Sequence, residues 1–203
     1  MTTTTKTALL KADFELAIKQ FAILTANTDT PWHLTSTQWG PSYLQRTVKV
    51  AAFKSSYMKS LEPLNNDNIF EDDDPALALP DPSIQTIMLD HHIVYSSTYQ
   101  VPVLYFDAYF PDGTRLGLDE IYEYIVPQVY QDDLKISPIQ AQGAITQADH
   151  PLLGRPFWYI HPCDTQTLLQ TIMQDVFIEN YIKIWLSLVG PLVRCSVSPN
   201  LFL

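Results

Sequence analysis

Two apolar segments joined by a short polar link constrain the fold of this chain more than any other feature. Residues 101–110 consist almost entirely of β-branched, aromatic and other apolar side chains, which favour β-strands, and residues 84–95 form a second candidate strand. The link Ser96-Ser97-Thr98 suits a turn. We therefore expect these two segments to pair as antiparallel strands.

Further strands are expected on both sides of this pair. Residues 32–38 and 43–53 are strand candidates separated by the turn residues Gly40-Pro41-Ser42, and residues 157–160 form a short one. Within 43–53, valines alternate with polar residues, which is the pattern of a strand with one face in water. The proline-punctuated stretch before residue 157 is predicted as a loop.

Apolar residues recur at helical spacing in four segments. Residues 7–24 carry one apolar stripe, residues 118–124 predict a short helix, and residues 165–176 and 178–189 predict two more. Gly190-Pro191 is a stop signal for the last of these. One helix, then strands, then helices is the order of an α+β fold, so we expect an antiparallel sheet packed by helices.

The length of 203 residues favours a single domain over residues 1–203, with ample apolar material for a core. Residues 61–82 differ from the rest, because acidic residues and asparagines alternate there with prolines. Like charges repel and prolines break strand pairing, so this segment is predicted to be a mobile acidic loop. A solvated insertion without a role and a docking site for a basic partner both remain open.

Charge and composition exclude several classes of function. The chain has 12 lysines and arginines against 22 acidic residues, which argues against nucleic acid as a partner. It has no glycine-rich phosphate-binding loop, no apolar stretch of roughly 20 residues that would cross a membrane, and no signal-peptide segment at its start. Two cysteines cannot build a disulfide framework, which fits a reducing compartment.

Cys163 is the strongest candidate for chemistry. It lies between Pro162 and the start of a predicted helix, where unpaired N–H groups and the helix dipole favour the reactive thiolate. Asp164 opposes this effect, because a like charge makes ionisation of the sulfur less favourable.

Several reactions of Cys163 remain open from the residue types alone. A papain-like hydrolase needs a histidine base, and His91, His92, His150 and His161 are available, although no family signature accompanies them. A zinc site or a redox pair would need further cysteines at close spacing, so we expect no metal. The remaining class is acyl transfer, in which a thiolate accepts a carboxyl group as a thioester and passes it to an amine.

The other histidines and the second cysteine have simpler interpretations. In the strand containing His91 and His92, one side chain should face solvent and the other the sheet, with structural roles. His150 is predicted to hold loop backbone. His161 points the same way as Cys163 if the segment is extended, so a supporting role for it stands beside a structural one. Cys195 is predicted to be incidental.

The region around Cys163 resembles a known family. Residues 149–154 (Asp-His-Pro-Leu-Leu-Gly) and 157–165 (Phe-Trp-Tyr-Ile-His-Pro-Cys-Asp-Thr) closely resemble the active-site region of the ubiquitin-like-conjugating enzymes of autophagy, the autophagy-related protein ten family. Blocks within residues 93–106, 112–121 and 185–191 agree in order, so the resemblance spans about residues 84–193.

The resemblance implies a modified ubiquitin-conjugating-enzyme-like fold and a transferase without metal or organic cofactor. Cys163 would accept the C-terminal glycine of autophagy-related protein twelve as a thioester from the activating enzyme, autophagy-related protein seven. The modifier would then pass to a lysine of autophagy-related protein five. It also implies a cytoplasmic protein that is recruited to pre-autophagosomal sites. A non-catalytic adaptor of the same fold and a cysteine hydrolase are the alternatives.

One departure from ordinary ubiquitin-conjugating enzymes concerns oxyanion support. Those enzymes place an Asn several residues before the cysteine, whereas no Asn occurs between Asn68 and Asn180 in this chain. We therefore expect support from backbone N–H groups after Cys163 or from the hydroxyl of Thr165, with His161 as a second supporting residue.

The segment around residues 99–106 has two interpretations. It is either a central strand or, because Pro102 cannot donate a backbone hydrogen bond, an edge or bulge that accepts a partner by strand addition. The resemblance favours docking of the acceptor nearby, so Tyr99, Pro102 and Tyr105 are the predicted partner-binding residues.

Overall fold

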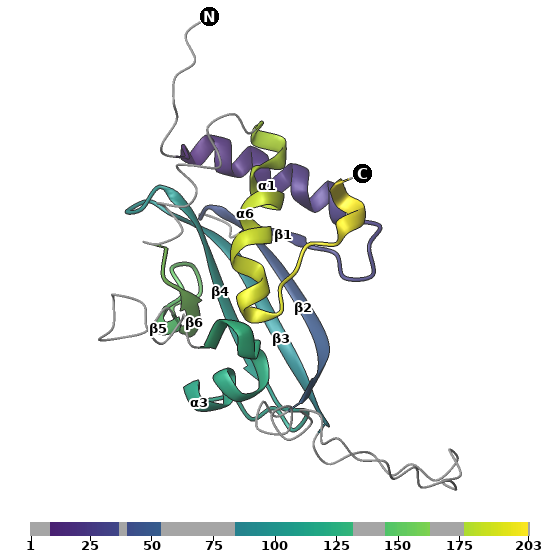
Figure 1. The fold of residues 1–203 in the computed structure, drawn as a ribbon. Coiled ribbons are helices and arrows are strands. Elements are labelled where there is room, and N and C mark those ends of the chain that lie inside the picture. The colour runs from purple at the N-terminus through teal and green to yellow at the C-terminus, as the bar shows by residue number, and fades with distance from the viewer. Residues whose placement is uncertain (1–8, 37–39, 54–83, 132–144, 163–176, 203) are drawn as a thin grey trace, which may run out of the picture.

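The computed structural model describes residues 9–36, 40–53, 84–131, 145–162 and 177–202 (Figure 1). Six strands form one antiparallel sheet in the order β1-β2-β3-β4-β6-β5. Helices α1 and α6 pack on each other and cover one face of that sheet. The predicted α+β fold, an antiparallel sheet packed by helices, is therefore confirmed.

The elements have the following bounds. The strands are β1 (His33–Ser36), β2 (Ser42–Phe53), β3 (Ile84–Ser96), β4 (Val101–Tyr109), β5 (Ile145–Asp149) and β6 (Pro156–Ile160). The helices are α1 (Lys11–Thr25), α3 (Leu118–Glu120) and α6 (Ile178–Val189), with a π-helical turn η2 (Ile121–Ile125) and 3-10 turns η3 (Gly190–Val193) and η4 (Pro199–Phe202).

The predicted antiparallel pair is the hairpin of β3 and β4. Its register runs from Met88 opposite Tyr109 to Ser96 opposite Val101. Gln100 closes the turn with a φ of 54°, and its N–H donates to the Ser96 carbonyl at 2.8 Å. β4 lies between β3 and β6, so the interpretation of this segment as a central strand is confirmed by the strand order. Its pairing with β6 covers only Tyr105 and Phe106, so strand addition along residues 101–104 stays a prediction.

The predicted strands before the hairpin are also confirmed, as β1 and β2. In β2, Val48 and Val50 are half-buried whereas Thr47 and Lys49 are exposed, as the alternation predicted. β2 pairs with β3 along ten positions, which makes these two strands the longest pairing in the sheet.

The prediction of a loop throughout the stretch before residue 157 was wrong for β5. β5 pairs with the whole of β6, from Ile145 opposite Ile160 to Asp149 opposite Pro156. Only its first side chain is buried, and five residues give too short an alternation to stand out in the sequence. Pairing with β6, a tertiary contact, therefore makes this segment a strand.

The predicted helices differ from the observed ones mainly at their ends. The stripe of α1 is confirmed, because Phe14, Ala17, Ile18 and Phe21 are buried. However, Leu10 precedes the helix in extended conformation and is exposed. The bounds of α6 are those predicted, and the helix at 165–176 and the acidic loop at 61–82 lie outside the described residues.

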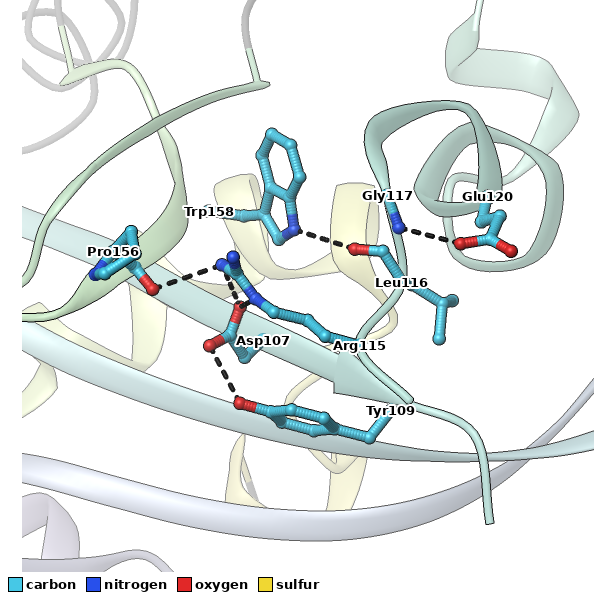
Figure 2. Close-up of polar contacts among 8 residues, drawn as sticks. All are labelled: Asp107, Tyr109, Arg115, Leu116, Gly117, Glu120, Pro156 and Trp158. Carbon is cyan, nitrogen blue, oxygen red and sulfur yellow. Dashed lines mark hydrogen bonds and ion pairs between the residues drawn. The ribbon is translucent and has the colours of Figure 1, made fainter. Parts of the chain in front are cut away.

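The short helix predicted at 118–124 is one helical turn, α3, that widens into the π-helical turn η2. Its start is capped by Glu120, whose Oε2 accepts the N–H of Gly117 at 2.8 Å (Figure 2). This contact satisfies a backbone donor at the helix start and places negative charge at its positive end.

A close backbone approach follows α6. The N–H of Cys195 donates to the Gly190 carbonyl at 2.8 Å. A Cβ atom at residue 190 would lie 2.0 Å from the Cys195 carbonyl oxygen, far inside van der Waals contact. Only glycine fits here, so the stop signal predicted from Gly190-Pro191 also serves the packing of the chain after the helix.

We predict that Gly190→Ala lowers the free energy of unfolding by about 3 kcal/mol or more, because the backbone must move to admit one methyl group. Urea denaturation measures this. Gly117→Ala is the matched control, since a Cβ there meets only Glu120 at 3.7 Å, and its stability should stay within about 1 kcal/mol of the wild-type value. Equal stabilities of the two variants would contradict the prediction.

Candidate active site

The candidate site lies where β6 ends. After Ile160 the chain continues through His161, which is half-buried, and Pro162, which is buried. Cys163 follows directly, and both Cys163 and Thr165 lie outside the described residues. The structure therefore defines the strand that leads to the predicted nucleophile and the side chains around His161, while the roles of Cys163 and Thr165 stay predictions.

His161 contacts a residue from the β3–β4 hairpin that the sequence had also singled out. The Tyr99 hydroxyl lies 3.5 Å from His161 Nε2, and the two rings meet edge to face at a centroid distance of 5.6 Å. The two residues are 62 positions apart in the chain. The fold thus brings together one predicted supporting residue and one predicted partner-binding residue.

Tyr105 extends this group along the sheet. It lies opposite Tyr159 in the β4–β6 register, and the two rings stack at 5.5 Å. Tyr159 in turn lies 6.0 Å from the His161 ring. Pro102 is buried in β4, whereas Tyr99 and Tyr105 are partly accessible, so a partner at this surface would meet the two tyrosines. Partner binding by all three residues stays a prediction.

A buried ion pair fixes β6 on β4 (Figure 2). Asp107, in β4, is 1% exposed and accepts from Arg115 Nε at 2.7 Å and from the Tyr109 hydroxyl at 3.0 Å. Arg115 also donates to the Pro156 carbonyl at 3.2 Å, at the start of β6. Burial raises the pKa of Asp107, and the Arg115 guanidinium opposes that rise.

Trp158 of β6 joins the same cluster. Its indole N–H donates to the Leu116 carbonyl at 3.3 Å, and the Arg115 guanidinium lies 5.5 Å from the centre of its ring (Figure 2). The sequence patterns considered above did not predict this cluster. A carboxylate inside the apolar run 101–110, followed by a turn and an arginine, was the signal that could have found it.

The two adjacent histidines of β3 are both buried, so the prediction that one of them faces solvent was wrong. His91 points to the helix-covered face, where its Nε2 bonds the Val193 carbonyl at 3.0 Å. His92 points to the opposite face, where the residues after β5 cover it. There its Nδ1 lies 3.1 Å from Nε2 of His150.

His150 holds loop backbone, as predicted. Its Nδ1 accepts the N–H groups of Leu152 and Leu153, both at 3.3 Å. That ring nitrogen carries no proton, so Nε2 carries one and donates to His92. His92 must then carry its own proton on Nε2, which lies 3.4 Å from Asp90. Burial raises the pKa of Asp90, but His92 and Thr47 more than offset this, so the net shift is downward.

Cys195 belongs to the core. Its side chain is fully buried and accepts from Arg46 Nη2 at 3.0 Å. Burial raises the pKa of this thiol to about 11, which leaves it protonated and unreactive near neutral pH. The prediction that Cys195 takes no part in chemistry agrees with this environment.

The described part of the chain lacks two kinds of feature. Among those residues no group of three or more His, Cys, Asp or Glu side chains is arranged to hold a metal ion. No helix among them is long and apolar enough to cross a membrane.

Comparison with known proteins identifies the family. Residues 13–200 match the model described as "Autophagocytosis associated protein, active-site domain". The chain belongs to this family. The resemblance to the autophagy-related protein ten family is likewise confirmed.

Individual curated proteins resemble this chain over part of its length. It is 43% identical over 120 residues to the ubiquitin-like-conjugating enzyme ATG10 of Homo sapiens, covering 56% of this chain and 51% of that protein. It is 33% identical over 124 residues to the enzyme of the same name from Dictyostelium discoideum, covering 55% and 52%. The chain thus spans about half the length of these curated relatives. A crystal structure of the autophagic E2 ATG10 superposes with a TM-score of 0.44 at 13% identity, covering 89% of this chain and 94% of that one.

We predict that the buried histidines make the fold sensitive to acid. Burial lowers the pKa of His91 to about 3 and of His150 to about 4, below the usual 6.5. Between pH 6.5 and about 4 the unfolded chain binds protons that the folded chain does not. Stability therefore falls with falling pH, by about 1.4 kcal/mol per pH unit for each histidine.

Urea denaturation at several values between pH 7 and 4.5 measures this slope. His150→Gln should remove the contribution of one histidine to the pH dependence of the free energy of unfolding. The slope of this variant should therefore be smaller than that of the wild type by about 1.4 kcal/mol per pH unit. His33→Gln is the control, because His33 is exposed and its replacement should leave the slope unchanged. A slope for His150→Gln equal to that of the wild type would refute the assignment.

Proposed function

We propose that this chain is a ubiquitin-like-conjugating enzyme that carries a modifier as a thioester on Cys163 and transfers it to a lysine. The family's active-site domain covers residues 13–200, and this match carries the proposal. More finely, the modifier is autophagy-related protein twelve, the donor is the activating enzyme autophagy-related protein seven, and the acceptor is autophagy-related protein five. The protein acts in the cytoplasm and is recruited to pre-autophagosomal sites.

The reaction consists of two acyl transfers. In the first, the Cys163 thiolate attacks the carbonyl carbon of the donor thioester, and the donor's cysteine leaves as a thiolate. In the second, a neutral lysine amine attacks the new thioester, loses one proton to a base, and displaces the Cys163 thiolate as the isopeptide bond forms. The carboxyl group of the modifier is already activated as a thioester before the first step, so the chain needs no nucleotide of its own.

The surroundings of His161 support this chemistry. The half-buried imidazole lies two residues before Cys163, with the Tyr99 hydroxyl 3.5 Å from its Nε2. A neutral imidazole at this position can accept a proton from an incoming amine or support the tetrahedral intermediate. Thr165 is the second proposed supporting residue, through its hydroxyl.

Tyr99 and Tyr105 are the proposed contacts for the acceptor. Both are only partly buried, on the same surface as His161. Tyrosine offers a large apolar ring and one hydroxyl, a combination that suits protein interfaces. Pro102, the third predicted partner-binding residue, would act by shaping the strand between them.

We predict that the chain, mixed with the activating enzyme, modifier and ATP, forms a thiol-sensitive adduct on a non-reducing gel. Cys163→Ser should convert this adduct to a thiol-resistant oxyester, because an oxygen ester does not exchange with thiols. Cys195→Ser is the matched control. It keeps a hydrogen-bond acceptor beside Arg46, so the adduct should form normally and stay thiol-sensitive.

The alternatives give different results in this assay. A wild-type chain that binds modifier and acceptor without forming an adduct would be an adaptor. A cysteine hydrolase would release free modifier from a fusion protein without ATP. Either result would overturn the proposal of a conjugating enzyme.

We further predict that Thr165→Val slows transfer from the loaded enzyme to the amine on the order of 10²-fold, the effect typical of losing one oxyanion donor. Loading of Cys163 should change less, as measured by single-turnover discharge against thioester formation. Thr165→Ser keeps the hydroxyl and should retain the wild-type rate. If Thr165→Val discharges as fast as the wild type, oxyanion support comes from another group.

A further inference from the structure

Two adjoining cavities lie at the other end of the sheet from the candidate active site. The inner one, of 240 Å³, is bounded by the end of α1, by Trp32 and by residues 196–201. The outer one, of 400 Å³, is bounded by residues 29–33 and by β2. Thr30 and Arg46 line both, so the two cavities meet at these side chains.

Arg46 is an unusual residue to find there, because its cationic side chain is only 7% exposed. One guanidinium nitrogen, Nη2, donates to the Cys195 sulfur, and the group lies 4.8 Å from the centre of the Trp32 ring. Its Nε has no hydrogen-bond partner, and no carboxylate pairs with it, among the residues that the structure describes. A buried cation with this little compensation is costly, and an anion would relieve the cost.

The rest of the lining limits the kind of anion. Hydroxyl groups of Thr30, Ser196 and Ser198 offer further donors, while Phe21 and Trp32 form apolar walls. A single cation beside apolar walls suits a carboxylate with a short hydrocarbon part better than a phosphate, which usually takes several donors and cations.

The charge distribution disfavours a polyanion. Asp29 lines the outer cavity and would repel a second negative charge. The chain as a whole carries a formal net charge of −10, which disfavours highly charged anions further. The lining therefore favours a ligand that carries one negative charge.

We propose that these adjoining cavities form a binding site for a monocarboxylate, in which the carboxylate pairs with Arg46 and the hydrocarbon part packs on Trp32 and Phe21. The ligand is either a free short-chain acid or the C-terminal carboxylate of a peptide that ends in a small apolar residue. The site is separate from the candidate active site, because β2 and β6 are three strand spacings apart, or roughly 14 Å. Binding there and thioester formation can be tested independently.

Titration of the ¹⁵N-labelled chain with isobutyrate, followed by NMR, tests the proposal. The Nε–H signal of Arg46 and the backbone amides of Thr30 and Ser198 should shift in a saturable way. Isobutyramide has the same shape without the charge and should cause no saturable shift. Equal shifts with both compounds, or none with isobutyrate, would overturn the proposal.

Two variants locate the site. Thr30→Glu places a carboxylate at the junction of the cavities, on an exposed residue outside the core, and should weaken isobutyrate binding at least about tenfold. Ser36→Glu adds the same charge at an exposed position outside the cavity lining and should bind like the wild type. Arg46→Met should also lose isobutyrate binding. If Arg46→Met does not fold, the Thr30→Glu variant alone tests the site. Wild-type affinity in Thr30→Glu would refute the site.

Competition with a pair of peptides distinguishes the two possible sources of the carboxylate. Acetyl-Gly-Val with a free carboxylate should compete with isobutyrate if the site accepts a peptide terminus, whereas its C-terminal amide should not. Binding of isobutyrate without competition by the free-acid peptide assigns the site to a small free acid.

Discussion

The buried carboxylate of Asp107 is the constraint on which the placement of the candidate active site depends. A charge inside the apolar strand β4 is tolerated only with a partner, and Arg115 supplies it while also donating to the Pro156 carbonyl at the start of β6. The cross-strand register between β4 and β6 covers only two positions. The ion pair therefore contributes much of what aligns β6, the strand that leads to His161-Pro162-Cys163.

A second polar system secures the other side of β6. His150 accepts two backbone N–H groups of the turn between β5 and β6, and its other ring nitrogen donates to His92 of β3. The turn is thereby tied to the centre of the sheet. Burial lowers the pKa of His150, and the neighbouring His92 and Arg155 lower it further.

The placement of polar and reactive groups divides the molecule into two regions. At the β6 end, Tyr99, Tyr105 and His161 are partly accessible and lie near the end of the strand that leads to Cys163. At the β2 end, Arg46 and Cys195 are buried beneath cavities that open between α1 and the C-terminal segment. The buried environment of Cys195 keeps its thiol protonated, which agrees with the prediction that this cysteine takes no part in chemistry.

The sequence alone predicted α1, α6, the strands β1, β2 and β6, the β3–β4 hairpin, and the motif that identifies the family. The patterns that predict them depend on neighbouring residues and are visible locally. Tertiary structure decided the rest. β5 is a strand because it pairs with β6, His92 is buried because the turn carrying His150 covers it, and Arg46 lacks a carboxylate partner within the described chain because of what the fold packs around it. Each of these features depends on contacts between residues far apart in sequence. Local sequence patterns do not predict the free energies of such contacts.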